Sequence, residues 1–281
     1  MLIDSHTHLF APDPVRYPVA DPRATYRPLT DGSVEFLRRE MNGANVARAV
    51  TISPWPYRWD MSYVLDVLPA NRSWLAVAVL IDPRSPAGPK QLEGYVKEHG
   101  VRGLRIHGRV MNLGPYDDPA TTPLWAKAAD LGITLDACAA LDEYPLIAKR
   151  AEQFPQLPII LDHCGYISPN VDPPEPDLPP VLAMARYPNV YAKLTFFGSA
   201  SKQNFPFRDV HGMARRIVDA FGPERCLYGS NFPTRQYNPK FTYNQTVELF
   251  STALDLTAEE RKWILGGTAA KLWQWGGSYP S

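Results

Sequence analysis

The sequence predicts an α/β protein, a single-domain (β/α)8 TIM barrel spanning residues 1–281. Eight short runs of β-branched or apolar residues alternate along the chain with segments of helical spacing. Strands that alternate with helices indicate successive βαβ units and a parallel sheet. Eight such units favour a closed barrel over an open, doubly wound sheet, and barrels of this kind routinely fill about 250 residues as one domain. No internal repeat, linker or block of charge divides the chain.

The expected elements follow one another in the order that such a barrel requires. Candidate strands are residues 2–5, 46–53, 75–81, 101–106, 133–137, 158–162, 190–195 and 225–229. Helical spacing covers residues 34–41, 91–99, 124–129, 144–154, 210–221 and 246–254, and a last helix is expected at 268–275. Thr257 and Glu260 have the spacing of a capping box, in which the hydroxyl accepts from the third helical N–H and the glutamate reaches back to the cap.

Composition and charge limit the classes of function. The chain has 29 Lys and Arg against 29 Asp and Glu, so its net charge of zero gives no electrostatic basis for binding nucleic acid or an anionic membrane. Cys138, Cys164 and Cys226 are scattered and contain no CxxC pair, which argues against disulfides or a thiolate zinc site. No apolar run approaches the roughly 18 residues of a membrane span, and the first ten residues predict a strand, not a signal peptide. We expect a cytoplasmic enzyme with a small-molecule substrate, and a homo-oligomer is compatible with the sequence.

Proline is about twice as frequent as in an average protein. The 29 prolines are spread through stretches such as residues 12–28 and 169–180. Because proline presets φ and reduces the freedom of the unfolded chain, these stretches predict stiff, ordered loops. We expect them over the C-terminal face of the barrel.

Polar side chains recur at alternate positions of four expected strands. The sets are Asp4, His6 and His8; Arg105 and His107; Thr134, Asp136 and Cys138; and Tyr191, Lys193 and Thr195. Alternate residues of a strand face the same side, so these side chains should face the barrel interior while their apolar neighbours pack on the helices. Buried polar groups need partners or a ligand. The four sets predict a polar cavity at the C-terminal ends of the strands, where barrel enzymes carry their catalytic groups.

His6 and His8 form a His-x-His pair at the end of the first strand. Two imidazoles at alternate positions point the same way, so they can share one metal ion or one substrate oxygen. The pair alone is a weak signal, because histidines also occur as ordinary core residues. Its place at the end of the very first strand strengthens the functional interpretation.

Several motifs, in order along nearly the whole chain, resemble those of a known family. The opening segment 3–8 (IDSHTH) resembles the first-strand signature of the amidohydrolase superfamily. Segments 161–165 (LDHCG), 188–194 (PNVYAKL) and 221–233 (FGPERCLYGSNFP) resemble the sixth, seventh and eighth strands of its lactonase-like, amidohydrolase-related branch. Segment 264–273 (ILGGTAAKLW) resembles the closing helix of that family.

The resemblance implies that His6, His8, His163 and a residue of the eighth strand surround the reacting carbonyl. The superfamily has an aspartate there, which takes a proton from the attacking water, whereas this chain has Asn231. A carboxamide is not a useful proton acceptor near neutral pH. In one interpretation Asn231 orients water or substrate and another group is the base; in the other, hydrolysis is lost, and the pocket only binds a ligand or catalyses a step without such a base. The candidates for the base are His163, His107 and Asp136. The polar residues that the chain keeps favour the first interpretation.

The resemblance leaves the metal content open. Metal-rich members of the superfamily carry a lysine on the fourth strand and a histidine on the fifth, where this chain has Arg105 and Asp136, so a binuclear centre is not expected. A mononuclear zinc or manganese site would use His6 and His8, joined by His163 or Asp136. The missing carboxylate at position 231 weakens such a site, because anionic ligands offset the charge of a divalent ion. Several members of the lactonase branch are held to work without metal, so we expect none or a single divalent ion.

The cationic residues indicate what the cavity holds. The candidate substrate-binding residues are Arg105, His107, Asp136 and Lys193. Fixed cations beside a polar cavity suit a carboxylate or another anionic group, which arginine can bind bidentately; Arg109 is a weaker candidate. The alternative is that these cations pair with Asp4, Asp136 or Asp162.

The residues together favour hydrolysis of a small lactone that carries a carboxylate or several hydroxyls. His6 and His8 would polarise the carbonyl, His163 would activate water, and Asn231 would orient it. One alternative is a non-oxidative decarboxylase of an aromatic or unsaturated acid, which needs a firmly bound metal; another is a non-catalytic ligand-binding barrel. The aromatic segment 54–59 (PWPYRW) after the second strand is expected either to form a wall for a ring-shaped substrate or to pack as an ordinary loop.

Overall fold

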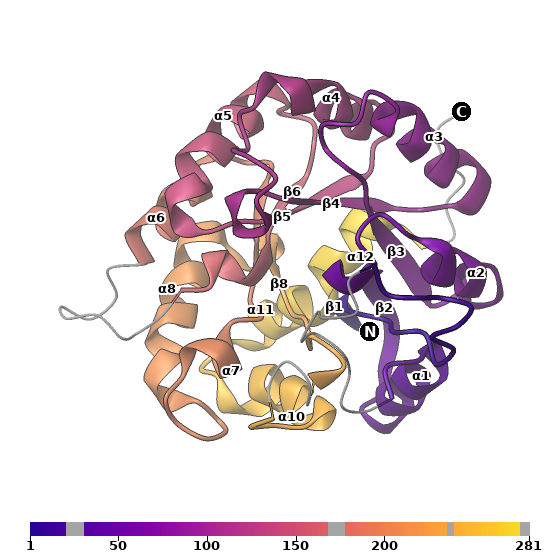
Figure 1. Ribbon diagram of the computed structural model, residues 1–281. Helices are drawn as coiled ribbons and strands as arrows, with labels where there is room; N and C mark the ends of the chain where they lie inside the picture. Colours follow the sequence, from indigo (N-terminus) through magenta and orange to yellow (C-terminus); the bar gives the residue numbers. More distant parts are fainter. Residues whose placement is uncertain (21–30, 168–177, 235–238, 276–281) are drawn as a thin grey trace.

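The centre of the molecule is a sheet of eight parallel strands in the order β1 to β8 (Figure 1). The computed structural model describes residues 1–20, 31–167, 178–234 and 239–275. The strands are β1 (Leu2–Thr7), β2 (Val46–Ile52), β3 (Leu75–Leu80), β4 (Gly103–His107), β5 (Thr134–Cys138), β6 (Ile159–Leu161), β7 (Val190–Lys193) and β8 (Cys226–Leu227). Each strand pairs in parallel with the next one along the chain. The predicted (β/α)8 barrel is confirmed.

The sheet closes where the chain that follows β8 meets β1. The N–H of Ser5 donates to the Tyr228 carbonyl at 3.1 Å, and the N–H of Asn231 donates to the His6 carbonyl at 2.9 Å. These bonds join the two edges that an open sheet would leave unpaired. They also place the residues after β8 next to the histidines of β1.

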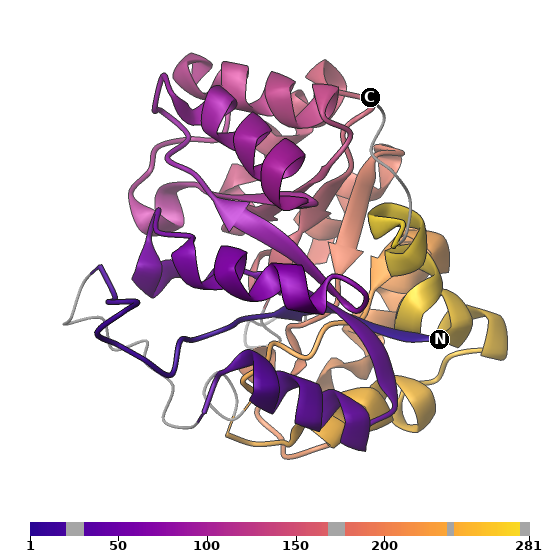
Figure 2. The same cartoon turned by 90° about the vertical axis from the view of Figure 1, so that its right-hand side faces the viewer.

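Helices surround the barrel, mostly between successive strands (Figures 1 and 2). They are α1 (Val34–Gly43), α2 (Ser62–Asn71), α3 (Gly88–His99), α4 (Thr122–Asp130), α5 (Tyr144–Gln153), α6 (Leu178–Ala183), α7 (Phe197–Ala200), α8 (His211–Phe221), α10 (Tyr243–Glu248), α11 (Ala258–Lys262) and α12 (Thr268–Trp273). Ser33 caps α1 by accepting a hydrogen bond from the N–H of Phe36 at 3.2 Å. Thr257 and Glu260 form the predicted capping box at the start of α11.

Apolar side chains pack in two layers. The larger layer lies between strands and helices and contains Leu104 and Ile106 of β4. The smaller layer fills the barrel near the start of the strands, with Ile3, Val50, Ala76, Ile160, Tyr191, Leu227, Ala269 and Trp273. Because the last two belong to α12, which packs against β1 and β8, this helix covers the N-terminal end of the barrel. Polar side chains are left for the opposite end.

An irregularity in β1 changes the side of the strand on which Asp4 lies. The register between β1 and β2 shifts in the stretch that follows Asp4, as it does at a β-bulge. Ile3 lies in the cluster inside the barrel, whereas Asp4 accepts a hydrogen bond from the Tyr243 hydroxyl of α10 at 3.0 Å. The prediction that Asp4 shares the interior face with His6 and His8 is therefore wrong. The extra residue in β1 lets the histidines face inward although Asp4 faces the helix layer.

The other differences concern single elements. β6 and β8 have only 3 and 2 residues, because the chain leaves the sheet in tight turns that carry polar side chains. α2 is not among the predicted helices, and it contains Pro69, a residue disfavoured inside helices. Of the proline-rich stretches, residues 21–28 and 169–177 lie outside the described residues. None of the described helices is long and apolar enough to cross a membrane.

Gly229, two residues after β8, tests how closely the barrel is packed at its seam. A Cβ atom there would lie 2.6 Å from His6 Cβ and 2.8 Å from Thr195 Cγ2. We expect Gly229→Ala to lower the free energy of unfolding by about 1–3 kcal/mol, because an extra methyl group in a full space forces its neighbours apart. Gly43→Ala is the control, since its Cβ meets nothing within 4 Å. Urea unfolding measures both variants, and equal midpoints would contradict this packing.

Candidate active site

Polar side chains gather at the C-terminal ends of the strands, as the sequence predicts. The set comprises His6, His8, Arg105, His107, Asp136, Asp162, His163 and Lys193, none of them more than 5% exposed. They come from β1, β4, β5 and β7 and from the turn Asp162–Gly165 that follows β6. Such deep burial requires that charges be paired and polar groups bonded.

The carboxylate of Asp162 is the centre of this set. Its Oδ2 lies 2.8 Å from Arg105 Nε, and its Oδ1 lies 2.9 Å from Lys193 Nζ. Lys193 Nζ also forms an ion pair with Asp136. His6 Nδ1 lies 3.4 Å from Asp162 Oδ1. One carboxylate thus joins side chains of β1, β4 and β7.

The buried charges compensate one another. Burial opposes ionisation of Asp162, but the charges of Lys193 and Arg105 hold its pKa well below the usual range. Burial raises the pKa of Asp136 to about 6 in spite of the opposing charge of Lys193. Burial alone would lower the pKa of Lys193, and the two carboxylates raise it instead. Near neutral pH the site therefore contains two cations balanced by two carboxylates.

His6 and His8 face each other, with 3.2 Å between their Nε2 atoms. His8 Nδ1 lies 2.8 Å from the Ile52 carbonyl oxygen, which only accepts, so Nδ1 carries the proton of His8 and Nε2 carries a lone pair. In this contact His6 donates from Nε2, so neutral His6 carries a lone pair at Nδ1 and makes no hydrogen bond to Asp162. Burial lowers the pKa of His8 to about 3 and that of His6 well below its ordinary value. Both imidazoles are therefore neutral near neutral pH.

His163 is held in a strained turn. It follows β6 with a φ of 56°, in the left-handed region that costs a non-glycine residue about 1–3 kcal/mol. Its Nδ1 lies 2.6 Å from the Thr195 hydroxyl, and its ring centroid lies 4.7 Å from that of His6. Burial lowers the pKa of His163 to about 3. The turn thus places a neutral imidazole beside the pair on β1.

His107 has no hydrogen-bond partner for either ring nitrogen among the described residues. Its ring centroid lies 5.0 Å from that of Trp55, in the aromatic segment after β2. The Arg58 guanidinium covers the Trp55 ring at 4.7 Å. The predicted aromatic segment therefore reaches the site, and His107 has both nitrogens available for a bound molecule.

Asn231 lies at the seam of the barrel. Its φ is 57°, and its N–H donates to the His6 carbonyl. Its side-chain Oδ1 has no hydrogen-bond partner in the described part of the chain. Asn231 lines a narrow cavity of about 30 Å³ together with Thr195 and Ser230. It is therefore close to the histidines, as its position in the sequence implies.

The structure gives Asp162 and Arg109 roles that differ from those predicted from the sequence. Asp162 is predicted only as a partner for a cation, yet it binds Arg105 and Lys193 at once and lies 3.4 Å from His6. The available signal is its position directly after a buried strand and before His163. Arg109 is not part of the cluster: its side chain is 56% exposed and lies 3.6 Å from Asp142.

The donor atoms of the site show whether these side chains could hold the predicted metal ion. A divalent ion between the Nε2 atoms of His6 and His8 would replace the proton that His6 donates. A catalytic zinc ion takes three protein ligands. The described residues contain no group of three or more His, Cys, Asp or Glu side chains that could hold a metal. Asp136 is engaged by a lysine, and a threonine holds Nδ1 of His163, which leaves only Nε2 of that imidazole as a donor atom. As they are placed, the described side chains therefore do not form a complete set of three ligands for a catalytic metal ion.

Comparison with known families places the chain. The model of a family described as amidohydrolase matches residues 3–275. The chain belongs to the amidohydrolase family. This confirms the resemblance seen in the motifs and the prediction of an enzyme of the amidohydrolase superfamily.

This amidohydrolase has curated relatives and solved neighbours of low identity. It is 26% identical over 274 residues to 4-sulfomuconolactone hydrolase of Hydrogenophaga intermedia, which covers 96% of this chain and 87% of that protein. It is 24% identical over 278 residues to L-fucono-1,5-lactonase of Burkholderia ambifaria, covering 97% and 95%. The structure of an amidohydrolase from Burkholderia multivorans with bound zinc superposes with a TM-score of 0.77 at 20% identity, covering 98% and 99%. The last comparison shows that the fold is shared.

Removal of the central carboxylate should destabilise the protein. Asp162→Asn would leave Arg105 and Lys193 with only Asp136 as a counter-charge, and we expect a loss of about 3–5 kcal/mol in the free energy of unfolding. Asp142→Asn is the matched control, because its carboxylate pairs with Arg109 at the surface; a change of about 0–1 kcal/mol is expected. Urea unfolding at neutral pH compares the two, and equal losses would contradict the role of Asp162.

Acidification should destabilise the protein at a pH above the range in which ordinary carboxylates take up protons. The imidazoles of His6, His8, His107 and His163 all have pKa values lowered from 6.5 by burial. Each takes up a proton on unfolding below that pH, which costs about 1.4 kcal/mol of stability per pH unit.

Two groups oppose this effect in part. The pKa values of Asp4 and Asp136, raised by burial to about 6, favour the folded state as pH falls from 6 toward 3.8. Four imidazoles outweigh two carboxylates, so we expect the urea midpoint to fall between pH 7 and pH 4.5. His163→Asn should weaken this dependence, and a midpoint that rises on acidification would contradict it.

Proposed function

We propose that this amidohydrolase opens a small lactone that carries an acidic group or several hydroxyls. The observation that carries the proposal is the neutral imidazole of His163, oriented by Thr195 beside the pair of His6 and His8. A neutral imidazole can accept a proton from water, and the site contains Arg105 for an anionic group. Two relatives are named for lactones, a sulfomuconolactone and a fuconolactone, which supports the same substrate class.

His163 is the base in the proposed reaction. With its Nδ1 proton donated to the Thr195 hydroxyl, Nε2 accepts a proton from water while the water oxygen attacks the lactone carbonyl carbon. The ring C–O bond then breaks, and the imidazolium returns the proton to the leaving oxygen. Asp162 supports this step, because its charge favours protonated His163. The product is the open hydroxy acid.

Donors at the site would stabilise the oxyanion formed by this attack. The Nε2–H of His6, which donates to His8 Nε2 in the resting site, can turn toward the developing charge. Fixed donors of this kind typically contribute a large share of the rate enhancement in acyl transfer. Asn231, with its unbonded Oδ1, would orient the attacking water.

The acidic group of the substrate would lie toward Arg105 and His107. Arg105 is 5% exposed, whereas Lys193 is fully buried between Asp136 and Asp162. We therefore assign substrate contact to Arg105 and assign Lys193 to holding the two carboxylates. Trp55, which lies against His107, would form an apolar wall for the ring.

Proton release from carboxylated lactones and sugar 1,5-lactones tests the proposal. We expect the wild type to open a member of this panel, and His163→Asn to lower kcat by a factor of about 10²–10⁴, as loss of a general base does. Thr195→Val should lower kcat with a smaller effect on KM, because it removes only the orientation of the base. His99→Asn, at the end of α3, is the control and should leave both constants unchanged.

Two further outcomes would overturn the proposal. Full activity in His163→Asn would exclude His163 as the base. Release of carbon dioxide without consumption of water would indicate a decarboxylase. Treatment with a chelator should leave activity unchanged, since the described residues contain no group of three side chains placed to hold a metal ion; a loss that zinc or manganese restores would contradict the metal-free mechanism.

A further inference from the structure

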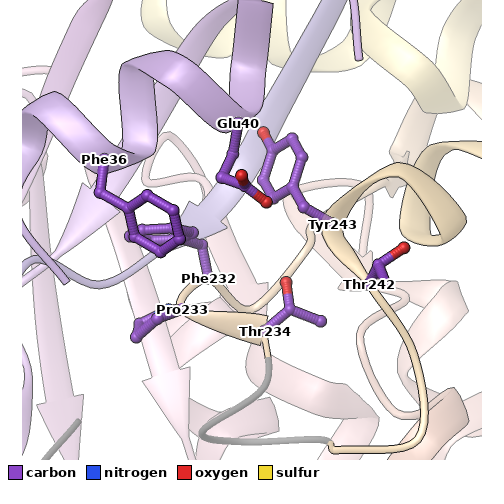
Figure 3. A pocket seen from close by; sticks show the side chains of 7 residues that line it. All are labelled: Phe36, Glu40, Phe232, Pro233, Thr234, Thr242 and Tyr243. Carbon is purple, nitrogen blue, oxygen red and sulfur yellow. The ribbon is translucent and has the colours of Figure 1, made fainter. Parts of the chain in front are cut away.

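A second cavity lies outside the barrel, between α1 and α10 (Figure 3). Its volume is about 280 Å³, close to the lower end of the range for small-molecule sites. The lining residues are Phe36, Glu40, Phe232, Pro233, Thr234, Thr242 and Tyr243. None of them belongs to the cluster around Asp162, so this cavity is separate from the candidate active site.

Two polar groups of this cavity have no partner among the described residues. Thr234 is 5% exposed, and its Oγ1 has no hydrogen-bond partner among the described residues. Figure 3 shows this hydroxyl oxygen turned toward the side of the cavity where the Glu40 carboxylate lies. Glu40 has no ion pair with any described residue. A buried hydroxyl without a partner indicates that a ligand or a water completes its bonding.

The remaining walls are suited to a cation. The Phe36 and Phe232 rings lie on one side of the Glu40 carboxylate and the Tyr243 ring on the other, and the faces of aromatic rings attract positive charge. The Phe36 ring already carries the Arg39 guanidinium at 4.6 Å. The hydroxyl of Thr242 caps α10 through the N–H of Gln245 and is therefore in use.

We propose that this cavity binds a small organic cation, a protonated amine with an apolar body. The ammonium group would donate to the Glu40 carboxylate and to Thr234 Oγ1, and the apolar body would lie against Phe232 and Pro233. A carboxylate with no cation of its own disfavours an anionic ligand. A neutral ligand would leave that carboxylate without a charged partner.

The cavity is joined to the active site through one buried carboxylate. Tyr243, which lines the cavity, donates its hydroxyl proton to Asp4 Oδ2 at 3.0 Å. Asp4 Oδ1 accepts from the N–H groups of His6 at 3.1 Å and of Ser230 at 2.9 Å. A ligand that contacts Tyr243 is thus linked, through Asp4, to the backbone that carries His6 and Asn231. The binding itself is independent of the proposed lactone hydrolysis.

Calorimetric titration with benzylamine, benzyl alcohol and benzoate tests the inference. We expect saturable binding of protonated benzylamine by the wild type and at least tenfold weaker binding of the alcohol and the benzoate. Glu40→Gln should weaken amine binding at least tenfold, and Thr234→Val should weaken it several-fold. Glu35→Gln, an exposed acidic residue on the same helix, is the matched control and should bind as the wild type does.

Further measurements keep this test separate from the active site and from folding. His107→Ala should retain amine binding, because His107 lies in the other site. Circular dichroism verifies that each variant is folded, and Glu40→Asp provides a second variant that keeps the charge and should bind better than Glu40→Gln. Absence of amine binding, equal binding of amine and alcohol, or unchanged binding in Glu40→Gln would overturn the inference.

Discussion

The ion pairs of Asp162 hold together side chains from two strands that are far apart in the sequence. Arg105 of β4 and Lys193 of β7 pair with this carboxylate inside the barrel, and His6 of β1 lies beside it. Two buried cations could not remain there without such an acceptor, because an uncompensated charge at this depth costs several kcal/mol. The placement of both cations at the polar end of the barrel depends on this balance.

Neutral imidazoles are the chemical consequence of that environment. Burial keeps His6, His8 and His163 unprotonated, and the cations of the cluster act in the same direction. A neutral imidazole with one oriented nitrogen can take over a proton transfer for which the superfamily uses an aspartate. Asn231 is compatible with an imidazole as the proton acceptor, because its carboxamide can orient water although it cannot accept a proton.

The seam between β1 and β8 lies between the candidate active site and the outer cavity lined by Glu40 and Thr234. The bulge in β1 turns Asp4 outward, where it binds Tyr243 and the backbone of Ser230 and His6. On one side of this seam lie the histidines, and on the other lie Glu40 and Thr234. The closure of the barrel therefore also provides a hydrogen-bonded link between the inner site and the outer cavity.

The sequence by itself determined the barrel, because alternation of strands and helices and of polar and apolar residues is a local property that periodicity reveals. It also placed His163 and Asn231 at strand ends, and the motifs indicated the family. Only the tertiary structure decided that Asp4 faces outward, since one extra residue in β1 reverses a face without any trace in the residue types. The central role of Asp162 and the outer cavity were likewise decided there, because they arise from contacts between segments as distant as β1, β7 and α10, and no pattern along the chain measures such distances.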